Sequence, residues 1–295
     1  MMDYDVVIVG GGPAGLTAGI YCVRRRLKAV VVERGALGGQ MNSTPEIANW
    51  PGDRLVSGPD LSKRMAEHAK SLGLETLFDD VVGLEPNGKP KTIYLRQRQL
   101  TCSAVIIATG GQHRKAAIKG QEEFEGKGVS YCATCDGPFF KGKSVAVIGS
   151  GNMAAEDALY LSELAGKTYL LAKALSAEDA LQSKLKKSKV EWVKEKAAEI
   201  SGSDKVASLK LESGKTLAVD GIFFSEGHTP SSELAKAAGV ELDERGFIKI
   251  NRSMETNIPG VYAAGDITGG IPQIATAVGE GCTAALKAYG YVKNP

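Results

Sequence analysis

The sequence predicts an α/β protein built from two similar domains, and three observations support this prediction. The chain has 295 residues, which corresponds to about two domains at the usual 100–200 residues each. Glycine accounts for 36 residues, about 12% against an average near 7%. Glycine-rich turns follow strand-like apolar runs at residues 10–15 and 149–154. We therefore expect two Rossmann-like, three-layer ββα nucleotide-binding domains.

The first strand–turn–helix unit lies at the N-terminus. Tyr4 to Val9 has the composition of a buried strand, and Leu16 to Arg26 has helical spacing with a basic end that suits the helix dipole. Ala29 to Val32 is predicted to form a second strand, and Ala104 to Thr109 a later one.

A second unit repeats this pattern further along the chain. Ser144 to Ile148 reads as a strand, a helix follows its turn as far as about Leu164, and Thr168 to Leu171 reads as the next strand. The first glycines of the two turns are 139 residues apart, which indicates two domains of one type rather than a short repeat.

The first domain is predicted to be split by the second. A strand that ends in Gly265 and Asp266 comes well after the second unit, and a polar stretch precedes a short strand at Phe247 to Ile250. We therefore expect the first domain at 1–111 and 242–295, with an inserted domain at 112–241.

Composition and charge exclude several classes of protein. The formal net charge is +2 and no block of like charge stands out, so we expect no nucleic-acid surface and no membrane-binding face. The N-terminus lacks the basic start of a signal peptide, and no apolar run is long enough for a membrane span. Five cysteines do not form a secreted disulfide framework, and a cytoplasmic location is expected.

The first glycine turn fits the dinucleotide-binding pattern GxGxxG. Gly10 permits the tight turn, Gly12 lets a pyrophosphate approach the backbone, and Gly15 allows close packing of helix on strand. Glu33, at the end of the second strand, is placed to accept hydrogen bonds from an adenosine ribose. The alternative is a tight turn that binds no ligand.

The second turn is a weaker nucleotide site. Gly149, Gly151 and Ala154 fit GxGxxA, with Asn152 and Met153 between them. No acidic residue that could bind the ribose of NAD follows the next strand, and no paired arginines that could bind the 2′-phosphate of NADP. Lys173 lies there between two alanines. The alternative is a nucleotide fold that has lost, or never had, its nicotinamide cofactor.

Cys132 and Cys135 form a CxxC pair between the two turns. Such a pair is half of a metal site or a redox dithiol, and the dithiol is favoured because no second CxxC or close histidine pair could complete a zinc site. Asp136 follows directly and could exchange a proton with the thiols. No metal site is expected.

These motifs together resemble low-molecular-weight thioredoxin reductases over essentially the whole chain. The resemblance rests on GGGPAG, ERGALGGQ, NWPG, IIATG, CATCDG, GSGNMA, GHTP, GVYAAGD and QIATAVGEG, in this order. It implies FAD in the split domain, a homodimer, and electron transfer to a thioredoxin-like protein. It also implies that Cys135 faces the flavin and that Cys132 attacks the partner.

The resemblance further implies a set of FAD-binding residues. Beyond the glycines and Glu33, the ribityl and isoalloxazine would lie near Gly39, Gln40 and Asn49, and Gln273, Ile274 and Ala275 would face the flavin's pyrimidine edge from a helix start. The remaining residues in this set are Pro13, Ala14, Thr109, Gly110, Gly265 and Asp266.

One departure from the family concerns the electron donor. The family's His-Arg-Arg phosphate grip aligns with Ala172, Lys173 and Ala174, so NADPH and NADH are expected to be poor reductants. Reduced ferredoxin or a reduced deazaflavin is the expected donor. The alternatives are an ordinary NADPH-dependent reductase, a reductase of a glutaredoxin-like or peroxidase partner, and a flavoprotein redox sensor with a regulatory CxxC.

Overall fold

A computed structural model describes residues 2–113 and 118–294 of the chain. The chain divides into two compact units, and each is described here by itself. Unit 1 comprises Met1–Gln112 and Thr229–Pro295, and unit 2 comprises His113–His228. Unit 2 is thus inserted into unit 1.

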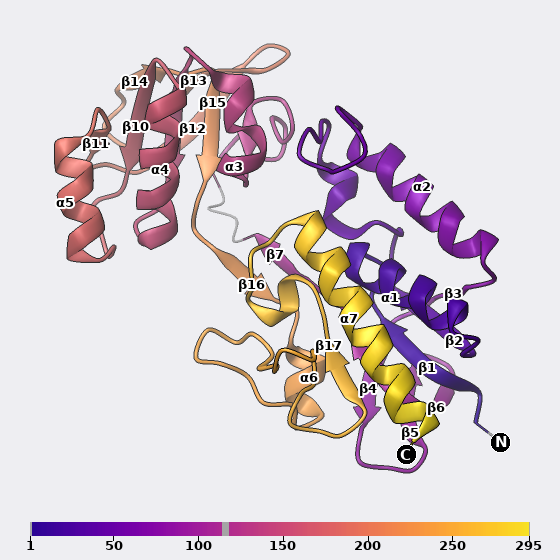
Figure 1. The fold of residues 1–295 in the computed structure, drawn as a ribbon. Coiled ribbons are helices and arrows are strands. Elements are labelled where there is room, and N and C mark those ends of the chain that lie inside the picture. Colours follow the sequence, from indigo (N-terminus) through magenta and orange to yellow (C-terminus); the bar gives the residue numbers. More distant parts are fainter. Residues whose placement is uncertain (1, 114–117, 295) are drawn as a thin grey trace. The chain divides into compact units, whose positions relative to one another are not determined.

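Unit 1 contains a seven-stranded sheet with the order β3-β2-β1-β6-β5-β4, and β17 pairs with β6 (Figure 1). β6 joins two kinds of pairing, because its first part runs antiparallel to β5 while its second part runs parallel to β1 and β17. The strands are β1 (Tyr4–Val9), β2 (Ala29–Glu33), β3 (Glu75–Phe78), β4 (Val81–Glu85), β5 (Lys91–Leu95), β6 (Gln99–Ile107) and β17 (Val261–Ala263).

Alternate residues of these strands face two separate cores. Val6 and Ile8 pack against helices α1 and α7, which lie together on one face of the sheet (Figure 1). Val7 and Val9 belong to the second core, with side chains of β4, β5 and α6. The helical segments are α1 (Pro13–Arg24), η1 (Gly39–Ser43), α2 (Gly58–Ser71), α6 (Glu233–Ala237), η3 (Asp266–Thr268) and α7 (Ile274–Lys293).

Unit 2 repeats the same three layers around a parallel sheet with the order β11-β10-β9-β15-β8. An antiparallel meander, β12-β13-β14, packs on one face of this sheet. The strands are β8 (Val129–Ser130), β9 (Ser144–Ile148), β10 (Lys167–Leu171), β11 (Glu191–Val193), β12 (Ala197–Gly202), β13 (Val206–Leu211), β14 (Thr216–Ala218) and β15 (Gly221–Phe224).

Helices cover the other face of this sheet. Val145 and Val147 of β9 pack against them, while Ala146 and Ile148 face the meander. The helical segments are α3 (Ala133–Asp136), η2 (Gly137–Phe140), α4 (Asn152–Leu164) and α5 (Asp179–Lys187). The predicted fold class, with two three-layer Rossmann-like domains, is confirmed.

The second boundary between the units differs from the predicted one. The sequence placed it at 241/242, but residues from Thr229 onward belong to unit 1. The reason is packing, because Ala235 and Val240 are fully or almost fully buried in the second core of unit 1. The two connecting segments pair as a short ribbon of β7 (Gly111–His113) and β16 (His228–Pro230).

One predicted strand is also absent. Residues 247–250 form no strand, and Ile248 instead makes an isolated bridge with Leu242 and donates its N–H to the carbonyl of Ile267. This segment is apolar because Ile248 is buried in the second core of unit 1, not because it joins a sheet.

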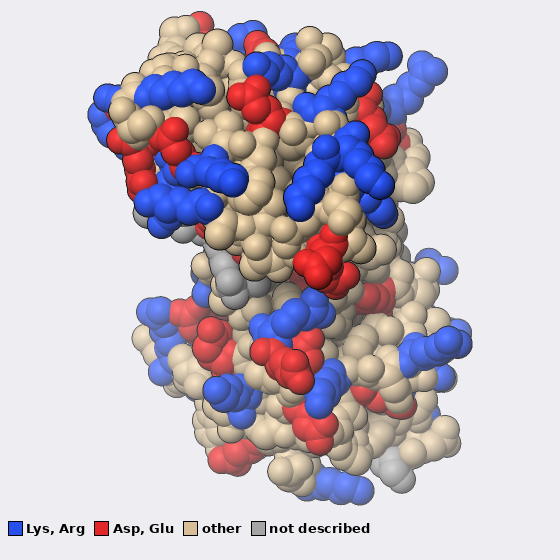
Figure 2. Space-filling model, turned by 90° about the vertical axis from the view of Figure 1, so that its left-hand side faces the viewer, with Lys and Arg blue, Asp and Glu red and all other residues tan. Residues whose placement is uncertain are grey.

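The surface carries charges of both signs. On the face shown in Figure 2, basic and acidic side chains are interspersed over the surface. No helix within residues 2–113 and 118–294 is both long and apolar enough to span a membrane.

Candidate functional site

In the turn between β1 and α1, packing within the protein requires glycine at two positions. Gly10 has a φ of 106°, and a β-carbon on it would lie 2.3 Å from the carbonyl oxygen of Ala108. A β-carbon on Gly15 would lie 1.9 Å from the carbonyl oxygen of Gly10. Larger residues at these positions would therefore push the turn and the helix away from the sheet.

Gly12 differs from its two neighbours in the motif. It precedes α1 with a φ of −74°, which any residue can adopt, and a β-carbon there would have no protein atom within 4 Å. Nothing in the described residues thus requires glycine at this position. The free surface at the helix N-terminus fits the pyrophosphate of a dinucleotide such as FAD.

Glu33 lies beside this turn. It ends β2, and its two carboxylate oxygens accept hydrogen bonds from the backbone N–H groups of Gly11 (2.7 Å) and Gly35 (2.8 Å). These bonds fix the carboxylate while leaving each oxygen a second lone pair for a ligand hydroxyl.

Several other predicted FAD residues gather around the same turn. Gly39 lies against Gly12, because a β-carbon on it would be 3.3 Å from the Cα of Gly12. A β-carbon on Gly265 would likewise lie 3.0 Å from the β-carbon of Ala14. Val9, Ile107 and Ala263 end their strands in register, so the loops that follow emerge at one edge of the sheet. Pro13 begins α1, and Gly110 and Thr109 follow β6.

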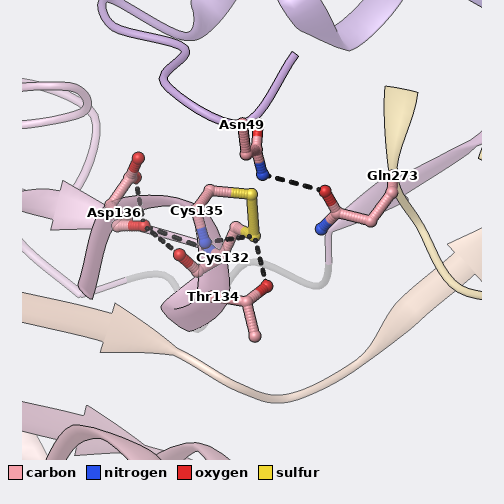
Figure 3. The surroundings of a disulfide bond; sticks show 7 residues. Asn49, Cys132, Thr134, Cys135, Asp136 and Gln273 are labelled. Atoms are coloured by element: carbon pink, nitrogen blue, oxygen red, sulfur yellow. Dashed lines mark hydrogen bonds between the residues drawn. A yellow bond between two sulfur atoms is a disulfide. The ribbon is translucent and has the colours of Figure 1, made fainter. Parts of the chain in front are cut away.

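Side-chain hydrogen bonds hold four other predicted residues of unit 1 in place. The Asn49 side-chain amide donates to Oε1 of Gln273 at 3.1 Å (Figure 3). The Gln40 amide donates to the carbonyl of Gly111 at 2.8 Å, and the Thr109 hydroxyl donates to the carbonyl of Ser231 at 2.8 Å. Gln273 directly precedes α7, whose first two residues are Ile274 and Ala275.

Asp266 is joined by a second carboxylate that the sequence reasoning missed. Glu280 on α7 accepts hydrogen bonds from the N–H of Gly265 (2.7 Å) and from the Thr268 hydroxyl (3.2 Å). Burial, and then the negative charge of Glu280, raise the pKa of Asp266 to about 6. Burial also raises the pKa of Glu280. Only the tertiary fold brings these two residues together, so no local pattern could have indicated the pair.

Asp266 should therefore destabilise the flavin-free protein at neutral pH. Its folded pKa of about 6 exceeds the ordinary 3.8, so its stabilising contribution is complete below pH 3.8 and is lost as pH rises through about 6. Asp266→Asn should raise the free energy of unfolding of flavin-free protein at pH 7 by on the order of 1–2 kcal/mol. Denaturant unfolding from below pH 3.8 to pH 7 measures this free energy. Glu46→Gln, at an exposed carboxylate, is the control. Equal curves for Asp266→Asn and wild type would contradict the prediction.

Cys132 and Cys135 are joined by a disulfide in unit 2, which confirms the dithiol interpretation of the CxxC pair (Figure 3). Cys132 follows β8 and caps the short helix α3, so the Cys135 N–H points at Cys132 Sγ at 3.2 Å. The Thr134 hydroxyl lies 3.4 Å from the same sulfur. Both sulfur-bearing residues are partly exposed.

Asp136 is held by Ser130, a residue that the sequence reasoning missed. The buried Ser130 hydroxyl donates to Oδ2 of Asp136 at 2.6 Å and accepts the N–H of Cys132 at 3.1 Å. Ser130 thus couples the carboxylate to the backbone of the first cysteine. No sequence motif includes Ser130, so only the structure indicates its role.

The second glycine turn resembles the first in its first two glycines. Gly149 has a φ of 154° and would place a β-carbon 2.5 Å from the carbonyl oxygen of Ser225, while Gly151 would meet no protein atom within 4 Å. Ala154 is buried behind the turn, and Met153 is exposed. Lys173 follows β10, where its ammonium forms an ion pair with Glu212 at 2.8 Å.

Two dinucleotide-type units, one of which carries a bonded Cys-x-x-Cys pair, define a flavin-dependent disulfide oxidoreductase. Residues 4–281 match the model of the pyridine nucleotide-disulphide oxidoreductase family. The chain belongs to this family and, within it, to the low-molecular-weight thioredoxin reductases.

Three relatives illustrate this membership. A thioredoxin reductase of Listeria innocua is 39% identical over 302 residues, which covers 99% of this chain and 94% of the relative. The crystal structure of thioredoxin reductase from Streptococcus pyogenes has a TM-score of 0.95 at 35% identity and 99% coverage of both chains. A ferredoxin-flavin thioredoxin reductase from Clostridium acetobutylicum has a TM-score of 0.56 at 36% identity and 99% coverage of both chains.

Proposed function

We propose that this protein reduces the disulfide of a thioredoxin-like protein through FAD and the Cys132–Cys135 pair. The observation that carries the proposal is the disulfide itself, which lies in a partly exposed turn where a second protein can reach it. The thioredoxin reductases of Listeria innocua and Streptococcus pyogenes support a thioredoxin-like substrate.

Unit 1 is the proposed FAD domain. The open N-terminus of α1 at Gly12 would take the pyrophosphate, Glu33 the adenosine ribose, and Asp266 the ribityl chain. Asn49 and Gln273 would lie near the flavin ring. When bound, FAD supplies the two electrons that reduce the Cys132–Cys135 disulfide. The other residues proposed for this site are Gly10, Pro13, Ala14, Gly15, Gly39, Gln40, Thr109, Gly110, Gly265, Ile274 and Ala275.

Cys132 is the proposed nucleophile toward the partner. In the dithiol form its thiolate would keep the hydrogen bond from the Cys135 N–H, which stabilises negative charge on Cys132 Sγ. This thiolate attacks one sulfur of the partner's disulfide and displaces the other as a thiolate. Cys135 then attacks Cys132 Sγ, which restores the Cys132–Cys135 disulfide and releases the partner as a dithiol. The partner gains two electrons and two protons, and the pair loses them.

Asp136 is the proposed proton carrier, positioned by Ser130. Ser130→Ala would remove the 2.6 Å hydrogen bond that stabilises the ionised carboxylate. We expect disulfide reduction to slow on the order of tenfold and its pH profile to move to higher pH, because the carboxylate loses one of the hydrogen bonds that stabilise its charge. Steady-state rates across pH measure both effects. Ser162→Ala removes a hydroxyl elsewhere in unit 2 and should leave the profile unchanged. An unshifted profile in Ser130→Ala would limit Ser130 to a structural role.

The proposed electron donor is reduced ferredoxin or a reduced deazaflavin rather than NADPH or NADH. The single cation after β10, Lys173, is paired with Glu212 and offers no bidentate grip on a 2′-phosphate. The ferredoxin-flavin thioredoxin reductase of Clostridium acetobutylicum, with a TM-score of 0.56, supports a protein as the electron donor.

An anaerobic donor screen tests this assignment. Flavin absorbance is followed while NADPH, NADH, reduced ferredoxin or a reduced deazaflavin is added, and thioredoxin reduction is measured in parallel. We expect fast bleaching with the last two donors and slow bleaching with both nicotinamides. Rapid bleaching by micromolar NADPH would return the protein to the NADPH-dependent reductases. Bleaching without thioredoxin turnover would instead favour a redox sensor.

A further inference from the structure

The loop after β10 is fastened to the second glycine turn by a set of hydrogen bonds. The Asn152 side chain donates to Oε1 of Glu178 at 2.9 Å and accepts the N–H of Glu178 at 2.8 Å. The N–H of Ser176 also donates to the carbonyl of Ser150 at 2.8 Å, and the two serine hydroxyls lie 3.3 Å apart. The loop and the turn therefore hold one another in a fixed position.

These bonds place a negative charge at the start of α4. Asn152 is the first residue of that helix, and it holds the Glu178 carboxylate beside the helix end where backbone N–H groups are unpaired. Glu178 also precedes α5, whose first residue is Asp179. A carboxylate is favourable there for the same reason that a dinucleotide pyrophosphate would be.

The turn itself leaves room for a ligand. A β-carbon on Gly151 would meet no protein atom within 4 Å, so packing does not close this surface. An entering dinucleotide would instead meet the charge of Glu178, and the ammonium of Lys173 is engaged by Glu212. Glu178 and Asn152 are both exposed, so this repulsion must be sensitive to salt.

We infer that Glu178 is a specificity-determining residue that, held by Asn152, disfavours anionic dinucleotides at the second glycine turn. The inference rests on the proposed donor assignment and supplies its physical cause. Lys173 accounts for the missing grip on a 2′-phosphate, whereas Glu178 acts on every dinucleotide because its charge opposes the pyrophosphate that all of them share.

A graded charge series tests this role. The probe is NADP⁺, which transfers no electrons to the oxidised flavin, and its dissociation constant is measured by equilibrium dialysis with FAD-loaded wild type, Glu178→Gln and Glu178→Lys. Glutamine keeps an oxygen that accepts from Asn152 but removes the charge. We expect binding about three- to fivefold tighter in Glu178→Gln and about tenfold tighter or more in Glu178→Lys at low salt.

Controls separate this charge from the overall charge of the protein. Glu163 lies exposed at the opposite end of α4, so Glu163→Gln and Glu163→Lys repeat the charge changes away from the turn. These variants should bind NADP⁺ like wild type, and the gain at Glu178 should shrink as salt is added. The double variant Glu178→Gln, Lys173→Arg should bind NADP⁺ more tightly still, because arginine presents a planar guanidinium group that can bind a phosphate through two hydrogen bonds.

The outcomes for this inference and for the proposed donor are distinct. Equal dissociation constants in wild type and both Glu178 variants, or no measurable binding in any of them, would overturn the role of Glu178. Micromolar NADP⁺ binding by wild type, with bleaching by NADPH, would overturn the donor assignment whatever the Glu178 variants do.

Discussion

Replacing either cysteine of the pair with serine is expected to lower turnover of a thioredoxin disulfide by roughly three orders of magnitude or more, because no other group supplies the thiolate. The two variants should nevertheless differ. Cys135→Ser retains Cys132 and should accumulate a mixed disulfide with the partner, since the resolving thiol is gone. Cys132→Ser should form no such adduct. Non-reducing electrophoresis and mass spectrometry measure the adduct.

The remaining cysteines provide the control for this pair. Burial raises the pKa of the Cys22 and Cys102 thiols to about 12, so neither ionises at neutral pH to compete. Cys282 is a partly exposed free cysteine on α7, and Cys282→Ser should turn over like wild type. Trapping by Cys132→Ser instead of Cys135→Ser would reverse the two proposed roles. Normal turnover in either variant would refute the pathway itself.

Local patterns were enough to predict the fold class and the disulfide. Tyr4–Val9 and Ser144–Ile148 are found as predicted, because a continuous apolar run before a glycine turn has few alternatives to a buried parallel strand. The CxxC pair was equally accessible, since three residues of separation bring the two sulfurs together on one short turn. Both predictions depend on neighbours in the sequence.

Predictions that depended on distant packing were wrong. The segment before Phe247 is polar and resembled a linker, yet Ala235 and Val240 pack under the sheet of unit 1 and move the boundary to residue 228/229. Ile248 has strand-like neighbours, but it is buried by the loop that contains Ile267. Sequence periodicity carries no information about which sheet buries such a segment.

Site residues outside the motifs were missed for a related reason. Ser130 and Glu178 matter through hydrogen bonds to Asp136 and Asn152, and Glu178 lies 26 residues from Asn152 in the chain. The contact between loop and turn exists only because β9 and β10 are adjacent in the sheet. The motif glycines could be predicted, whereas the charges that decide what they bind could not.

Gly12→Val is expected to remove most of the bound FAD while leaving the fold intact. A β-carbon at Gly12 meets no protein atom within 4 Å and the φ of −74° suits any residue, so neither the backbone nor the first side-chain atom opposes valine there. Its methyl groups would occupy the surface proposed for the FAD pyrophosphate. We expect the flavin content per chain, measured from the absorbance of the purified protein, to fall about tenfold or more. The far-ultraviolet circular dichroism should stay unchanged.

Gly151→Val is the matched control, because it makes the same change at the same place in the second turn. Gly151 also precedes its helix, has a φ of −86° and offers the same open space, so both variants bear the same small loss of an N-terminal glycine cap. If FAD belongs to unit 1, Gly151→Val keeps its full flavin content and Gly12→Val loses it. Flavin retained in Gly12→Val but lost in Gly151→Val would exchange the roles of the two units, and flavin retained in both would show that neither open turn carries the pyrophosphate.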